Sequence, residues 1–139
     1  MELRRITGCI LGVIAAFVVM MAWELVANYV FPPPPQWGGD DHAMAMQAPA
    51  GALVILLLGY VVGVMAGALV AVRFVREGSW PAWVVAGVMI VGAVGVLVQM
   101  PHPLWFMVLA PLLMAGAGWL TGALSGPGNR ALIAGDAAP

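Results

Sequence analysis

Glu24 is the one acidic or basic residue that lies well inside an apolar stretch of this sequence. Asn28 follows four residues later, and residues at this spacing share one face of a helix. Gln99 and His102 stand at the end of the third apolar stretch and directly after it. If these stretches are helices, the four side chains form a polar cluster at one depth. Such a cluster can bind a proton or a small ion, with the carboxylate and the imidazole as the titrating groups.

The same four residues are also compatible with a purely structural role. Glu24 can extend its carboxylate toward the membrane surface, or Asn28 and Gln99 can hold it as interhelical hydrogen-bond partners. Counting along a helix from Ile6 places Glu24 about 27 Å from the start of the first apolar stretch, near the edge of a hydrocarbon layer of about 30 Å. A charge near the edge costs less than one at the centre, and this favours the structural interpretation.

A second candidate site is the segment 40–46, DDHAMAM, between the first two apolar stretches. Thioethers and imidazoles suit copper ions, so His42, Met44 and Met46 are candidate ligands. The motif lacks repeated ligands, and this favours a short interfacial helix whose methionines lie in lipid. We therefore expect no metal site and keep copper binding on this outer loop as an alternative.

Other chemistry lacks the residues that it needs. Bis-histidine haem ligation would have to use His42 and His102, the only two histidines, and neither lies in the middle of a helix. Cys9 and Ser79 are expected a membrane thickness away from His102, whereas a nucleophile and its base must be within hydrogen-bond reach. The chain has no lysine and a net charge of -1, so no basic patch for nucleic acid exists. We expect no catalysis and no cofactor.

Composition indicates the elements that position these residues. The chain of 139 residues is 63% hydrophobic and 8% charged, with a mean hydropathy of +1.03. A soluble domain carries about 25% charged residues. The sequence therefore predicts an integral membrane protein, and an all-α one, because a helix satisfies its backbone hydrogen bonds within lipid.

Four apolar stretches are long enough to cross a bilayer, which takes about 20 residues per helix. The expected spans are residues 6–31, 49–72, 80–100 and 103–124, which make one transmembrane domain over residues 1–124. Between and after them we expect an outer loop at 32–48 and a flexible cytoplasmic tail at 125–139. With four spans all the arginines fall on one side: Arg4, Arg5, Arg73, Arg76 and Arg130. The positive-inside rule then places both termini in the cytoplasm, with the helices as two antiparallel hairpins.

Small residues recur at helical spacing within the spans. Gly59, Gly63 and Gly67 follow one another every four residues, in the pattern of a glycine zipper that lets two backbones approach closely in lipid. A shorter strip is Gly8, Gly12 and Ala16. The full set of expected helix-packing residues is Gly59, Gly63, Gly67, Gly92, Gly95, Ala115, Gly118 and Gly122.

Two short motifs carry a resemblance to a known group of proteins. YVFPPPP at 29–35 and MPHPLWF at 100–106 resemble sequences of a family of small, uncharacterised bacterial membrane proteins with four spans. The resemblance implies a multi-pass protein of the bacterial inner membrane and supplies no activity.

The expected function follows from the residue types that the sequence lacks and from those that it has in excess. Catalytic groups are missing, while small-residue strips exceed what one four-helix unit needs. We therefore expect a non-catalytic protein that acts through helix packing, as an accessory subunit of a membrane complex or a small homo-oligomer. Its partners are lipid and other membrane helices. The alternatives are a transporter or channel element that uses the Glu24 cluster, and outer-face copper binding.

Overall fold

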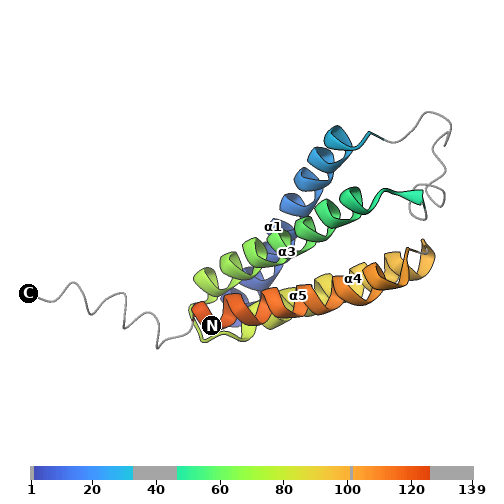
Figure 1. Ribbon diagram of the computed structural model, residues 1–139. Coiled ribbons are helices and arrows are strands. Elements are labelled where there is room, and N and C mark those ends of the chain that lie inside the picture. Colours follow the sequence, from blue (N-terminus) through green and yellow to red (C-terminus); the bar gives the residue numbers. More distant parts are fainter. Residues whose placement is uncertain (1, 33–46, 101, 126–139) are drawn as a thin grey trace, which may run out of the picture.

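The computed structural model describes residues 2–32, 47–100 and 102–125, and within them the chain forms four long α-helices (Figure 1). They are α1 (Glu2–Val30), α3 (Ala50–Val75), α4 (Trp80–Gln99) and α5 (Leu104–Leu124). Each helix is long and apolar enough to cross a membrane. The described part of the protein is therefore all-helical with four candidate membrane spans, as the composition predicts.

The helix ends differ by a few residues from the expected spans. α1 begins at Glu2 rather than near residue 6, and an acidic residue in the first turn suits the positive end of the helix dipole. α3 continues past residue 72 to Val75, where Arg76 takes a left-handed conformation with φ of 60° and its N–H donates to the carbonyl of Val72. Ser79 occupies the N-cap position of α4, but its hydroxyl makes no capping hydrogen bond.

Successive helices run in opposite directions, so the bundle has two ends (Figure 1). At the arginine end α1 begins, α3 ends, α4 begins and α5 ends. At the proline end α1 finishes, α3 starts, and the short turn after α4 leads into α5. We name the two ends by the residues that mark them, which are Arg4, Arg5, Arg73 and Arg76 at one and Pro32, Pro49 and Pro103 at the other.

α3 is the central helix, because it packs against α1, α4 and α5. The largest fully buried side chains come from α3, α4 and α5 and include Phe106, Met114, Val64 and Val85. α1 lies at the periphery and buries only a narrow stripe of small residues: Gly8, Gly12, Ala16 and Ala27. The core cluster is therefore built mainly from α3, α4 and α5, and Ala16 is the residue of α1 that belongs to it.

The outer surface of the bundle is apolar on all four helices. Large hydrophobic side chains such as Leu25, Val91 and Leu104 are 71%, 74% and 80% exposed. A continuous apolar surface of this kind cannot face water and must be covered by lipid or by other protein.

Candidate functional site

The closest helix contact in the described structure joins α1 to α3 through two rows of small residues. A Cβ atom added at Gly12 would lie 2.7 Å from the Cβ of Ala71, 2.7 Å from the carbonyl oxygen of Gly67 and 2.9 Å from a methyl of Val85. A Cβ at Gly67 would strike the carbonyl oxygen of Gly12 and the Cβ of Ala16. Glycine is required at both positions because the two backbones themselves are in contact.

Both rows repeat every four residues along their helices. Such rows are inclined to the helix axis, and two of them interdigitate when the helices cross at about −50°, or about −40° in the related transmembrane packing. The gap therefore widens away from the crossing, and large side chains fill it. The ring of Trp23 lies on Gly59, and the ring of Phe31 lies on Gly51.

Trp23 also fixes α1 to α3 by a hydrogen bond. Its indole Nε1–H donates to the carbonyl oxygen of Ile55 at 2.8 Å. Sequence reasoning does not single out Trp23, since a tryptophan within an apolar stretch resembles any packing residue, and only the α1–α3 register supplies its acceptor.

This register places Glu24 deeper than the count from Ile6 indicates. Trp23 lies against Gly59, the tenth of the 26 residues of α3, so the adjacent Glu24 is level with the first half of α3 rather than with its start at Ala50. The count from Ile6 assumes an upright helix, whereas an inclined α1 uses more residues to cross the same thickness. Glu24 therefore lies between the proline end and the centre of the bundle.

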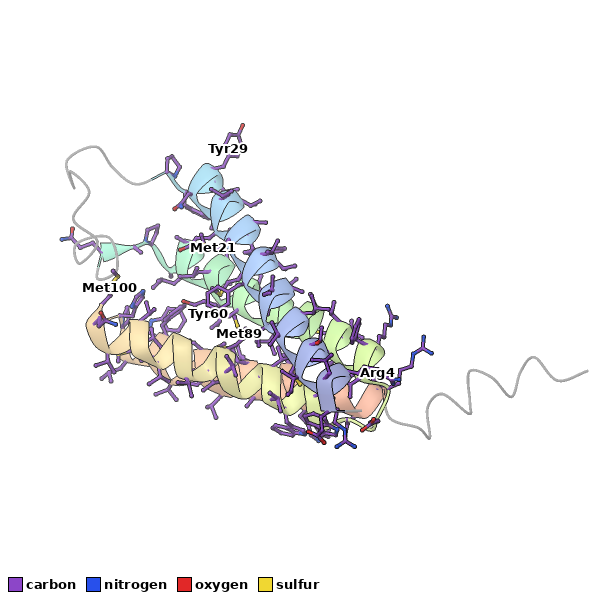
Figure 2. The ribbon with its side chains drawn as sticks, turned by 180° about the vertical axis from the view of Figure 1, so that it is seen from behind. Arg4, Met21, Tyr29, Tyr60, Met89 and Met100 are labelled. Atoms are coloured by element: carbon purple, nitrogen blue, oxygen red, sulfur yellow. The ribbon has the colours of Figure 1, made fainter. Side chains whose placement is uncertain are left out.

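Tyr60 of α3 belongs to the buried core cluster. Tyr60 is only 9% exposed, and its ring packs against Phe106 with ring centroids 6.1 Å apart. Figure 2 shows the Tyr60 side chain in the space between α3 and the α4–α5 pair. Among the described residues, no buried side-chain nitrogen or oxygen atom is without a hydrogen-bond partner.

Gln99 and His102 lie elsewhere and are engaged locally. The side-chain amide of Gln99 donates to the carbonyl of Gly95 in its own helix at 3.0 Å. The His102 Nδ1–H donates to the carbonyl of Met100 at 2.7 Å, and the imidazole stacks on Phe106 with centroids 5.0 Å apart. No hydrogen bond or ion pair joins them to Glu24 or Asn28 within residues 2–32, 47–100 and 102–125. The four residues that the sequence groups together are thus divided between two places.

This division follows from the direction of α1. In both views α1 leaves the α4–α5 pair as it rises to the proline end, and Figure 2 places Tyr29 far from Met100. α1 and α4 touch near Gly12 and Val85, well toward the arginine end. Glu24 and Asn28 therefore travel with α1 along α3, away from the turn that holds His102.

The remaining packing residues fall into two groups. Gly118 and Gly122 of α5 face α4, where a Cβ would lie 2.5 Å from the Cβ of Ala86 and 3.3 Å from that of Ser79, respectively. Ala115 on the same side is partly buried. Gly92 and Gly95 of α4 are open, with no heavy atom of the described residues within 4 Å of an added Cβ. Gly87 and Gly116, which the sequence analysis did not select, are open in the same way.

The arginine end is held by polar contacts that the sequence did not specify. The Arg5 guanidinium forms an ion pair with Glu77 at 2.6 Å and a longer one with Glu2 at 3.3 Å. Arg4 donates to the carbonyl of Val75, the last residue of α3. These contacts tie the start of α1 to the α3–α4 connection.

Within the described residues no group of three histidine, cysteine or acidic side chains is arranged to hold a metal ion. The copper candidates His42, Met44 and Met46 lie outside the described residues. The chain matches no protein-family model, no curated protein and no solved structure.

Proposed function

We propose that this protein is a non-catalytic membrane protein that acts by packing its helices against other transmembrane helices. It serves as an accessory subunit of a larger membrane complex or as a small homo-oligomer. The membrane is the bacterial inner membrane, with both termini in the cytoplasm and the helices arranged as two antiparallel hairpins. The gathering of Arg4, Arg5, Arg73 and Arg76 at one end of the bundle supports this orientation.

One observation carries the proposal. The space beside some helical glycines is occupied by a neighbouring helix of the chain, and the space beside others is open among the described residues. A glycine inside a helix costs roughly 0.5–1 kcal/mol relative to alanine. At Gly12, Gly63 and Gly67 this cost is offset by close backbone contact within the chain. Gly92 and Gly95 have no such contact within the described residues, although they occupy the interior of α4. A helix from another polypeptide would supply it.

The test compares leucine substitutions at matched positions. Gly92→Leu with Gly95→Leu would block a helix that approaches α4, and Val108→Leu places the same side chain on α5 at an exposed position that is not an open glycine. After mild extraction into lipid nanodiscs, native mass spectrometry should give an assembly for the wild type and for Val108→Leu, and a lone chain for the double variant. A wild-type protein that is a lone chain with no co-purifying subunit contradicts the proposal.

A second candidate function, a proton or ion site in a small transporter, is favoured by the position of Glu24 within the helical part of α1 that packs along α3. An ionisable residue inside a membrane span is commonly part of a transport pathway. With Gln99 and His102 engaged elsewhere, this site reduces to Glu24 and Asn28. It requires that Glu24→Gln abolishes a proton-dependent flux in proteoliposomes while the protein still folds. If Glu24→Gln abolishes both folding and flux, a structural role for Glu24 is favoured.

A further inference from the structure

A groove lies between the first turns of α1 and the start of α4, at the arginine end of the bundle. It has a volume of about 410 Å³, and its lining residues are Glu2, Arg5, Ile6, Cys9, Ile10 and Trp80. The five residues of α1 are spaced three, one, three and one apart, so they share one face of the helix. Gly12 then comes against Val85 of α4, two residues beyond Ile10. We name this space the α1–α4 groove.

The lining of the α1–α4 groove changes from polar to apolar along α1. Glu2 and Arg5 come first, and Ile6, Cys9 and Ile10 follow. From Glu2 to Ile10 the helix rises about 12 Å, whereas the interfacial layer on each side of a bilayer is about 5–8 Å thick. The groove therefore begins at the level of the lipid head groups and continues into the hydrocarbon. This order of polar and apolar surface matches a phospholipid molecule.

The two charged residues of the groove have capacity for further contacts. The Arg5 guanidinium contacts Glu77 through Nε and Nη2, both at 2.6 Å, and Glu2 through Nη1 at 3.3 Å. These contacts use three of its five N–H donors, and within the part of the chain that the structure describes two remain. The Arg5 side chain is 40% exposed and the Glu2 side chain 82%. Arg5 can therefore donate to a phosphate oxygen, and Glu2 can accept from a cationic donor.

This pair of charges selects among phospholipid head groups. A head group with a phosphate and no cation would meet Arg5 but would be repelled by the Glu2 carboxylate. A choline group carries a positive charge and has no N–H to donate. An ethanolamine group carries an ammonium with three N–H donors beside its phosphate, so it complements both residues.

We propose that the α1–α4 groove binds one molecule of phosphatidylethanolamine. The phosphate accepts hydrogen bonds from Arg5, the ammonium donates to Glu2, and the first part of an acyl chain lies along Ile6 and Ile10. Trp80, which is 40% exposed, covers the opposite side from α4, in the interfacial position that tryptophan favours. This site is independent of the packing function proposed above.

The test compares three lipids that have the same two oleoyl chains and differ in their head group. The full chain in a mild non-ionic detergent is titrated separately with phosphatidylethanolamine, phosphatidylcholine and phosphatidylglycerol. Native mass spectrometry gives the dissociation constant of the first bound lipid. Phosphatidylethanolamine should bind about fivefold more tightly than either of the others, the ratio that one exposed ion pair provides.

Charge variants assign the preference to residues. Glu2→Gln removes the partner of the ammonium and should bring the ratio of phosphatidylethanolamine to phosphatidylcholine affinity close to one. Arg5→Gln should weaken binding of all three lipids several-fold, because each carries a phosphate. Glu77→Gln breaks the same ion pair but keeps the guanidinium, so phosphatidylethanolamine binding should persist. Arg73→Gln removes an arginine at the same end that does not line the groove, and it should change nothing.

A steric variant then locates the lipid. Ile10→Trp places a large ring in the groove, and Met21→Trp places the same ring on α1 outside it. The two native side chains are 53% and 54% exposed, so neither substitution disturbs the core. Ile10→Trp should weaken phosphatidylethanolamine binding several-fold, and Met21→Trp should leave it unchanged. Circular dichroism checks that all variants are helical to the same extent.

Equal binding of the three lipids, tighter binding of phosphatidylcholine, or a preference that survives Glu2→Gln overturns the proposal. Phosphatidylethanolamine binding that Ile10→Trp leaves unchanged also overturns it, because the lipid then binds outside the groove. Tighter binding of phosphatidylglycerol that is lost with Arg73→Gln would show a general attraction of anionic lipid to the arginine end instead. None of these outcomes bears on the packing function, which the α4 double variant tests separately.

Discussion

Gly12 and Gly67 lie backbone to backbone where α1 crosses α3, and the carbonyl oxygen of each occupies the place where the other would carry a side chain. Transmembrane helices have no hydrophobic driving force between them, so this proximity supplies the van der Waals contact that holds the peripheral α1 to the bundle. Because α1 buries little else, the crossing determines both the attachment and the direction of the helix.

We expect Gly67→Ala to destabilise the protein by about 1–3 kcal/mol, as overpacking does in a close-packed interior. The added methyl would meet the Gly12 carbonyl and Ala16, neither of which can rotate away. Gly116→Ala is the matched control, since nothing lies within 4 Å of its added Cβ, and it should be neutral or slightly stabilising. Unfolding free energies measured by steric trapping in bicelles compare the two. Equal stability of both variants would show that the α1–α3 contact is not formed as described.

We expect Trp23→Phe to cost about 1 kcal/mol or somewhat more, because it keeps an aromatic ring near Gly59 and removes the hydrogen bond to Ile55. Trp119→Phe is the control, because Trp119 is 60% exposed on the surface of α5. The same unfolding measurement should find Trp119→Phe close to the wild type. If Trp23→Phe and Trp119→Phe have the same free energy of unfolding, the Trp23 indole makes no hydrogen bond to α3.

The sequence predicts those features of the packing that depend on the residues of one helix alone. The four-residue spacing of Gly59, Gly63 and Gly67 identifies a contact face, because periodicity along one helix is a local property. The spacing does not say which helix fills the face. In the structure the partner is the strip that begins at Gly8 and Gly12.

The polar residues show where sequence reasoning ends. Grouping Glu24 with His102 assumes upright helices whose ends meet at one height. Interlocked rows of four-residue spacing incline α1, and this inclination takes Glu24 along α3, where the adjacent Trp23 lies on Gly59, while His102 stacks on Phe106. The crossing angle arises from contact between two helices, so it cannot be read from the order of residues in either one.

We expect the Arg5–Glu77 pair to contribute little to stability, because the Arg5 side chain is 40% exposed and the Glu77 side chain 29%. A double-mutant cycle with Arg5→Ala and Glu77→Ala measures this coupling free energy. The coupling should shrink as salt is raised from 0.05 to about 0.5 M, because salt screens exposed charges. A large coupling free energy that salt leaves unchanged would show that the pair is desolvated.

The last prediction concerns the direction in which the chain crosses the membrane. Gln47 precedes α3 at the proline end, and Ser125 follows α5 at the arginine end. In a Cys9→Ser background, which removes the single native cysteine, Gln47→Cys and Ser125→Cys each provide one thiol at a known end of the bundle. A charged maleimide that cannot cross the membrane should label Gln47→Cys in intact cells and Ser125→Cys only after permeabilisation. The physical reason is that arginines stay on the side where the chain is made, and the four arginines of the described residues share the end that carries Ser125. Labelling of both thiols in intact cells, or of Ser125→Cys alone, would contradict the proposed orientation.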